Sequence, residues 1–230
     1  MNARQVATMI ASTCQDLRSL GLVAFDNSPC QRQEGPFHRV SWPTTGASPA
    51  RALPFGSLDQ YLSLIREGAF TCLLNDYSIL QASYDCDGTS VVAHSLLYWP
   101  APVAIHEPLE DLGDLCAAVS MCMESPARAA PLCELYLRSP MRFDFDPDRA
   151  SEDHPEVHLH TQFDDTRIHI DRPMSFTTFV KMVFKTFYRD IWNSCPDLGR
   201  LHEQRVPLVK DEFAPVAHSL CLSWSADRDE

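Results

Sequence analysis

A histidine-rich run in the second half of the chain carries the residue types that metal binding and proton transfer use most. Three of the seven residues in 154–160 are histidine, and Asp144 and Asp146 precede them closely. Imidazole nitrogens and carboxylate oxygens are common ligands of zinc and manganese, and histidine changes its charge nearest to neutral pH. The spacing matches neither the HExxH helix motif nor a Cys/His finger, so only the residue types point to chemistry here.

The first hypothesis is a divalent metal ion. The predicted ligands are His154, His158 and His160, with Asp144 or Asp146 as the carboxylate. The competing interpretation is a structural network, in which the histidines hydrogen-bond to backbone carbonyls and aspartates without any ion. At the level of sequence both interpretations stay open.

Two arginines near these residues suggest a phosphate substrate. Arg142 and Arg167 carry the planar guanidinium that binds phosphate oxygens in pairs, and a metal-bound water beside them would make a metal-dependent phosphodiesterase or nuclease. Without a metal, His158 or His160 would act as general base beside the arginines, as in metal-independent ribonucleolytic toxins. The predicted catalytic residues are Arg142, Asp144, His158, His160 and Arg167.

Three short strands must position these side chains. In 141–146, 156–163 and 166–171, apolar residues alternate with polar ones, and alternate residues of a strand face opposite sides of a sheet. We therefore expect one apolar face and one polar face, the polar one holding Arg142, Asp144, Asp146, His158, His160, Gln162, Arg167, His169 and Asp171. An antiparallel sheet often has a solvated polar face, so a surface without function is the alternative.

The remaining pattern predicts an α+β protein. A meander of strands is expected at 70–76, 78–86 and 90–99, with the Asp87-Gly88 pair as a hairpin turn. Helical spacing of apolar residues predicts amphipathic helices at 3–20, 57–67, 109–123 and 175–193, and 27–54 is expected to be an irregular connection with a short strand near 38–42. The sheet would have about six strands, the meander plus three later ones, covered by these helices.

One domain is expected over residues 1–230. It would consist of an N-terminal helix and irregular segment (1–56), a core (57–195) and a C-terminal extension (196–230) with a strand at 218–224. The nine cysteines form no CxxC pair and mostly lie in apolar runs, which favours a reducing, cytoplasmic location. No segment approaches 18 consecutive apolar residues, so no membrane span or membrane partner is expected.

Net charge argues against a free-standing nucleic-acid-binding protein. The chain carries a net charge of −12, whereas nucleic-acid binding neutralises phosphates with a basic surface. Lys181, Lys185 and Arg189 are spaced four apart along the helix expected at 175–193. This basic stripe would contact a partner or nucleic-acid phosphates, or it is simply the solvated side of a core helix.

Several stretches together resemble a bacterial family catalogued as domain of unknown function 2290. They are SPMRFDFD at 139–146, HPEVHLH at 154–160 and the helix entry RIHIDRPMSFTTFVKMVFKTFY at 167–188, within a similarity that covers residues 74–189. The positions that match the family pattern are Arg142, Phe143, Asp144, His154, Pro155, His158, Leu159, Arg167, Phe187 and Tyr188. His169 and Asp171 depart from that pattern.

The resemblance implies no particular activity and leaves open whether the protein is an enzyme. The family's scattered occurrence in bacteria resembles that of mobile-element and phage-defence components. It therefore implies an accessory subunit of such a system, acting with a larger protein partner encoded nearby. The alternative is the small metal- or histidine-dependent nuclease or phosphodiesterase described above.

Overall fold

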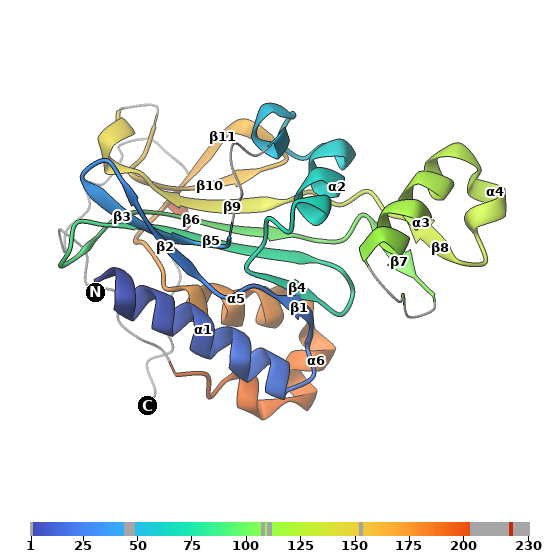
Figure 1. The fold of residues 1–230 in the computed structure, drawn as a ribbon, viewed down its shortest axis with the longest axis horizontal. Coiled ribbons are helices and arrows are strands. Elements are labelled where there is room, and N and C mark those ends of the chain that lie inside the picture. The colour runs from blue at the N-terminus through green and yellow to red at the C-terminus, as the bar shows by residue number, and fades with distance from the viewer. Residues whose placement is uncertain are drawn as a thin grey trace.

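A large antiparallel sheet forms the centre of the structure, a computed structural model that describes residues 2–43, 49–106, 109, 112–151, 154–202 and 221–222 (Figure 1). Its strands are β1 (Val23–Asp26), β2 (Cys30–Glu34), β3 (Phe37–Ser41), β4 (Cys72–Leu74), β5 (Ile79–Cys86), β6 (Val91–Trp99), β9 (Met141–Phe145), β10 (Val157–Thr161), β11 (Phe163–Ile170) and β12 (Cys221–Leu222).

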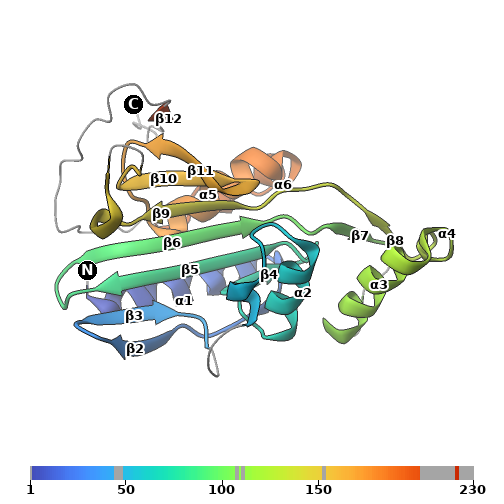
Figure 2. The same ribbon diagram turned by 90° about the horizontal axis from the view of Figure 1, so that it is seen from above.

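Strand order joins the meander to the later strands. Within the described residues the order is β1-β4-β5-β6-β9-β10-β11-β12, and the β2–β3 hairpin is attached through β3 and β5. Among the strand pairs that the structure describes in this sheet, only β11–β12 is parallel; the strand order can be followed in Figure 2. The α+β class and the antiparallel sheet are confirmed, and the sheet is larger than the six strands expected.

One face of the sheet is covered by helices from both ends of the chain. These are α1 (Ala3–Ser19), α5 (Phe176–Phe187) and α6 (Arg189–Ser194), followed by the short helix η3 (Pro196–Leu198) (Figure 1). Asn2 and Gln5 form a capping box at the start of α1, and the Ser175 side chain caps α5. The apolar rows of β9, β10 and β11 belong to the core under these helices, as the alternation predicted.

The other face is covered only in part. Helices η1 (Pro49–Ala52) and α2 (Leu58–Arg66) pack over Ile79, Leu97 and Trp99 at one end of the sheet. Along β5 and β6 the same face then continues with Ser83, Ser95 and other small or polar residues. This change from apolar to polar residues leaves room for a cavity.

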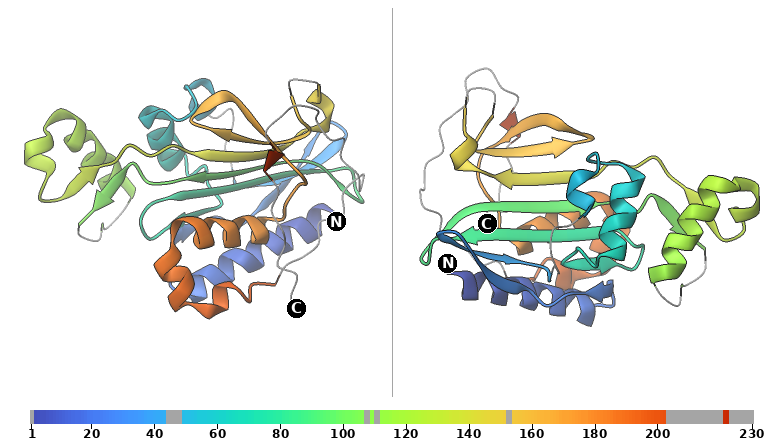
Figure 3. Two further views of the ribbon diagram at one scale, coloured as in Figure 1. Left: turned by 180° about the vertical axis from the view of Figure 1, so that it is seen from behind. Right: turned by 45° about the horizontal axis from the view of Figure 1, so that its top comes forward.

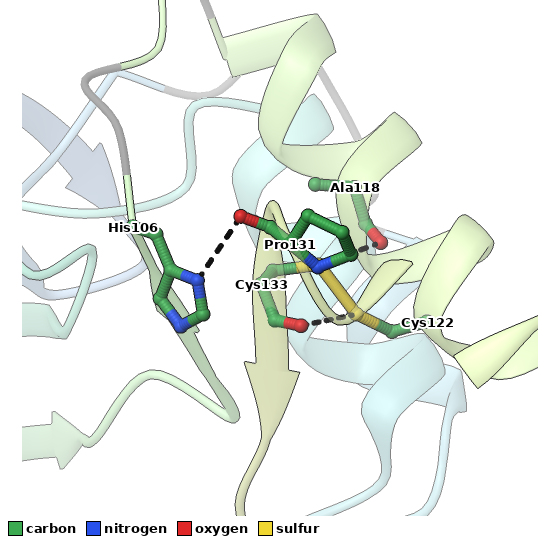
Figure 4. Close-up of a disulfide and its surroundings, with 5 residues drawn as sticks. All are labelled: His106, Ala118, Cys122, Pro131 and Cys133. Atoms are coloured by element: carbon green, nitrogen blue, oxygen red, sulfur yellow. Dashed lines mark hydrogen bonds between the residues drawn. A yellow bond between two sulfur atoms is a disulfide. The ribbon is translucent and has the colours of Figure 1, made fainter. Parts of the chain in front are cut away.

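A small subdomain, here called the arm, projects from the body in every view (Figures 1, 2 and 3). It consists of β7 (Val103–Ile105), α3 (Leu112–Glu124), α4 (Pro126–Ala129) and β8 (Cys133–Leu135), and β7 pairs with β8. Cys122 and Cys133 form a disulfide beside Pro131 (Figure 4). This disulfide was not expected, because the two cysteines do not form a recognisable sequence motif.

Three segments differ from expectation. Residues 27–54 were expected to be irregular apart from a short strand near 38–42, which is present as β3; β2 was not expected, and with β3 it forms a hairpin whose turn contains Gly35 at φ 59°. The helix expected at 175–193 is broken between α5 and α6, because Tyr188 leaves helical geometry (φ −124°, ψ 50°) and donates a 2.8 Å hydrogen bond to Asp76. Phe163, expected in the core, is exposed because Gln162 turns the chain at φ 58°.

The C-terminal strand expected at 218–224 is present at Cys221–Leu222, and its other positions lie outside the described residues. None of the helices in the part of the chain described here is long and apolar enough to cross a membrane. The boundaries proposed within the single domain remain predictions.

Candidate metal centre

Neighbouring strands bring the predicted polar rows together. His158 lies opposite Asp144 in the β9–β10 pair, and opposite His169 in the β10–β11 pair. His160 lies opposite Arg142. Directly opposite residues on one face have closely spaced side chains. The three polar rows therefore form one continuous polar surface, which the sequence could not show because it does not reveal which strands are neighbours.

Asp144, His158 and His160 form a compact cluster, here called the triad. The two Nε2 atoms of His158 and His160 are 2.9 Å apart, and Asp144 Oδ2 lies 3.2 Å from His160 Nε2 and 3.9 Å from His158 Nε2. A circle through these three atoms has a radius of about 2.0 Å, which equals the usual zinc–nitrogen and zinc–oxygen distance. One ion at that point would lie within ligand distance of all three atoms, in place of the hydrogen bond that joins the two histidine nitrogens.

The hydrogen bond on the far side of His158 suits a metal ligand. Its Nδ1 lies 2.7 Å from the Pro155 carbonyl oxygen. Because a carbonyl can only accept, Nδ1 carries the hydrogen, and the lone pair of the neutral ring is on Nε2, which faces the other triad atoms. Metal-binding histidines usually have their second nitrogen fixed in this way.

Electrostatics keep His158 neutral and Asp144 charged, the states in which these two side chains bind metal. Burial, against the opposing effect of Asp144 and together with the neighbouring His160, lowers the pKa of His158 to about 4. Burial alone would raise the pKa of Asp144, but the hydrogen bond from His160 and the charge of Arg142 outweigh it and hold the pKa well below its usual range. At neutral pH the site thus has a neutral His158 and a charged carboxylate.

Arg142 connects the triad to the helical cover. Its Nε donates a 2.8 Å hydrogen bond to Asp144 Oδ2, the same oxygen that faces the histidines. The guanidinium carbon lies 5.1 Å from the centre of the Phe55 ring, within cation–π range. Phe55 belongs to the segment between η1 and α2, so this cover also positions the arginine.

A cavity of about 680 Å³ opens beside Asp144 on the same face of the sheet. Four arginines and five carboxylates line it: Arg32, Arg39, Arg142 and Arg149, with Glu34, Asp85, Asp144, Asp146 and Asp148. Five phenylalanine and tryptophan residues also line it: Phe37, Trp42, Phe55, Trp99 and Phe145. Its volume lies in the range of small-ligand sites.

The structure separates the predicted ligands into an inner and an outer set. The triad includes Asp144, whereas Asp146 lines the cavity and pairs with Arg149 at 3.5 Å. His154 stacks edge-on against His158, with ring centres 4.5 Å apart, but is not one of the clustered ligand atoms. Arg167 lies two residues from His169 on β11 and therefore shares its face, and burial and the charge of Arg167 lower the pKa of His154.

The basic stripe lies elsewhere. Lys181 and Lys185 are on α5 and Arg189 begins α6, and both helices cover the sheet face opposite the triad. These residues therefore cannot contact a ligand in the cavity. Their proposed role in binding a partner or nucleic acid remains a prediction.

Sequence reasoning missed the part of the cavity that the hairpin contributes. Arg39 on β3 makes two 2.7 Å hydrogen bonds with the carboxylate of Asp85 on β5. Arg32 on β2 lies opposite Arg39 in the hairpin. The alternation of apolar and polar residues in 37–41 was the available signal, but it is too short to predict the strand with which Arg39 pairs.

Fold and triad together define an α+β protein with a candidate metal centre on one face of an extended antiparallel sheet. The chain belongs to the family described as uncharacterized conserved protein (DUF2290), because the model of that family matches residues 22–224. This match confirms the resemblance found at 74–189 and extends it in both directions. No curated protein and no solved structure gives a significant match.

Proposed function

We propose that the protein is a metal-dependent hydrolase of phosphate esters, a phosphodiesterase or nuclease. The observation that carries the proposal is the triad, whose three donor atoms surround one point at about 2.0 Å, next to a cavity lined by arginines. Asp144, His158 and His160 would hold the ion. A divalent ion at this position would polarise a phosphoryl oxygen and lower the pKa of a bound water.

Arg142 is the residue best placed to bind the phosphate. It contacts the carboxylate of the triad and also lines the cavity, so it can reach an ester oxygen beside the ion. Arginine suits this role because its guanidinium stays charged and offers paired donors. Arg167 is not among the residues that line the cavity and would be a second, more distant cation.

The pKa of His158 favours this mechanism over metal-free catalysis. A general base works best when its pKa is near the working pH, and His158 has a pKa of about 4 because it is buried. At neutral pH it would be a weak base but a competent ligand. The alternative in which His158 itself removes a proton is therefore less well supported.

Elemental analysis of the purified protein tests the proposal directly. We expect close to one zinc or manganese ion per chain, and loss of that ion in His158→Ala and His160→Ala variants. Hydrolysis of bis(p-nitrophenyl) phosphate should be lost in parallel. His38→Ala, which changes an exposed histidine on β3, is the matched control and should keep both metal and activity.

An absence of metal after dialysis against each ion would contradict the proposal. Melting temperatures must accompany these measurements, because both triad histidines are buried. A variant that loses metal at an unchanged melting temperature supports a ligand role. If the wild-type protein contains no metal and the variants have a much lower melting temperature, the histidines form a purely structural hydrogen-bond network.

A role as subunit of a larger assembly is the second candidate. The arm favours it, because Met123, Leu132 and Leu135 are exposed on a subdomain that projects from the body. Exposed apolar residues on a projecting element are typical of protein interfaces. An accessory subunit of a phage-defence or mobile-element system would bind its larger partner there, or through the basic stripe on α5 and α6.

Co-expression with the products of neighbouring genes tests this second candidate. A true subunit should form a stoichiometric complex that survives gel filtration. Leu135→Asp on the arm should abolish the complex if the arm is the interface, whereas Lys185→Glu should abolish it if the basic stripe is. A complex unaffected by either change would exclude both surfaces.

A further inference from the structure

The charge of the cavity restricts the substrates that it can hold. Its lining carries four arginines against five carboxylates, a net charge of −1. A divalent ion on the triad would change the net charge of the loaded site to about +1. Such a site matches a ligand with a single negative charge and is poorly matched to dianionic monoesters or to polyphosphates.

The arginines are also restrained by carboxylates. Arg39 is held by Asp85 and Glu34, Arg142 by Asp144, and Arg149 by Asp146. Each arginine would offer only part of its hydrogen-bonding capacity to a ligand. The arginines are therefore suited to bind a single phosphate group and are poorly suited to bind a polyphosphate.

Aromatic residues supply the second half of the recognition. Phe55 lies 6.2 Å from Trp99, centre to centre, and Arg142 lies against the Phe55 ring. Phe55 therefore contacts the same arginine that contacts the triad. If the aromatic group of a substrate stacks on Phe55, the phosphate of the same substrate would lie within one side-chain length of the ion.

The wall is held in place by its own backbone. Gly56 adopts φ 82°, a conformation that favours glycine, and its N–H donates to the Gln60 side chain at 3.2 Å. The amide of Gln60 in turn donates to the Ala50 carbonyl at 3.0 Å. Phe55 is thus presented by a fixed turn, as a preorganised binding wall requires.

Together these observations identify a substrate class, and the inference rests on the function proposed above. We propose that the cavity binds a small phosphodiester bearing a nucleobase, with the base against Phe55, whose ring packs on the buried Trp99, and the singly charged phosphate between Arg142 and the triad. A cavity of about 680 Å³ holds a ligand of this size and would not hold a duplex. The ligand would be a dinucleotide, a cyclic nucleotide or the end of a single strand.

Two pairs of substrates test the inference with the metal-loaded protein. Bis(p-nitrophenyl) phosphate and p-nitrophenyl phosphate share a leaving group but differ in charge, and we expect kcat/KM to be at least on the order of tenfold higher for the diester. Thymidine 5′-(p-nitrophenyl phosphate) and methyl p-nitrophenyl phosphate differ in the nucleoside. We expect KM to be roughly tenfold lower for the thymidine ester, as one stacked base contributes.

Phe55→Leu is the diagnostic variant, because it keeps an apolar side chain but removes the ring. It should abolish the KM advantage of the thymidine ester while metal content stays at the wild-type level. Phe25→Leu, on β1 and outside the cavity lining, is the matched control. Equal KM values for the two esters in the wild type, or a preference for the monoester, would overturn the inference.

The proposed function and this inference can fail separately. If no ester is hydrolysed by protein that contains metal, the hydrolase proposal fails. Calorimetric titration with thymidylyl-thymidine then decides the binding inference alone. Binding that is lost in Phe55→Leu would uphold the nucleobase site, and no heat of binding to the wild type would overturn it.

Discussion

At the level of single residues, burial decides what the histidines can do. His158 and His94 are both buried, and burial lowers the pKa of each to about 4. Such a ring is a weak general base at neutral pH, but as a neutral imidazole it can bind a metal or accept a hydrogen bond. His94 does the latter, since its Nε2 accepts from the Met174 N–H at 3.3 Å.

His94 should make the apo-protein sensitive to acid. Its pKa lies near 4 in the folded state and near 6.5 in the unfolded chain, so only the unfolded state takes up this proton between those values. The stability is therefore complete above pH 6.5 and falls as the pH drops towards 4, by about 3 kcal/mol for this group. Urea denaturation between pH 4.5 and 7, with a chelator present, measures the slope.

His94→Gln is the matching variant for that measurement. Glutamine can still accept from Met174 but does not titrate, so the variant should show a shallower fall in stability with acid. If wild type and variant have parallel pH profiles, His94 is not the group responsible. His158 contributes to the same pH window, so the slope should decrease and not vanish.

A second prediction at the level of residues concerns which of the two aspartates, Asp144 or Asp146, binds the ion. Asp144→Asn keeps the shape of the side chain but removes the charge that faces both histidines, and metal affinity should fall by at least on the order of tenfold. Asp146→Asn, two positions away on the cavity wall, should leave metal content unchanged. Equal losses in both variants would mean that both carboxylates bind the ion.

At the level of elements, the sequence predicted those segments whose pattern is long. Strands β5, β6, β9 and β10 and helices α1 and α2 were predicted close to their actual bounds, because alternation or helical spacing persists over several residues. Strand β2 was missed since Cys30–Glu34 is almost wholly polar, whereas β3 matches the strand expected near 38–42. The site followed the same rule: β9 and β10 could be predicted, but the arginines of the hairpin could not.

The turn before α2 provides a prediction at this level. Gly56 has φ 82°, and an added Cβ would lie 3.4 Å from the Gln162 carbonyl oxygen. Gly56→Ala should therefore destabilise the fold by about 1 to 3 kcal/mol, and it should weaken substrate binding by moving Phe55. Gly199→Ala, at an ordinary negative φ of −66°, should cost much less in the same denaturation experiment.

Helix α5 is expected to be essential for the sheet that carries the site. Phe179 is fully buried, and its ring lies 5.7 Å from that of Phe143 on β9. Phe179→Ala should cost about 3 to 5 kcal/mol, measured by chemical denaturation. Arg189→Ala, on the exposed start of α6, should change stability little, and a comparable loss there would show that the basic stripe is structural.

At the level of the whole molecule, the two faces of the sheet have different tasks. The face under α1 and α5 is a continuous core, whereas the face under α2 is closed at one end and hollow at the other. No local pattern predicts this division, because it depends on which strands become neighbours. Asp144 lies next to Ser95 only because β9 pairs with β6, although the whole arm separates these two strands along the chain.

The arm should behave independently of the site. Its disulfide closes a short loop between Cys122 and Cys133, and a loop of this size adds about 3 kcal/mol to local stability in the chain-entropy account. A Cys122→Ser, Cys133→Ser double variant should show faster hydrogen exchange in α3 and α4. Its metal content should match the wild type, and a loss of metal would mean that arm and site are coupled.

The positions of the site residues along the chain also bear on how the protein folds. All three triad ligands lie within residues 144–160, so bringing them together closes only a short loop. Arg32 and Arg39, on the opposite side of the cavity, come from a hairpin near the start of the chain and require the complete sheet. An ion could therefore bind to a partly folded chain in which β9 and β10 have paired. Catalytic activity, in contrast, would appear only after the last and most distant contacts have formed.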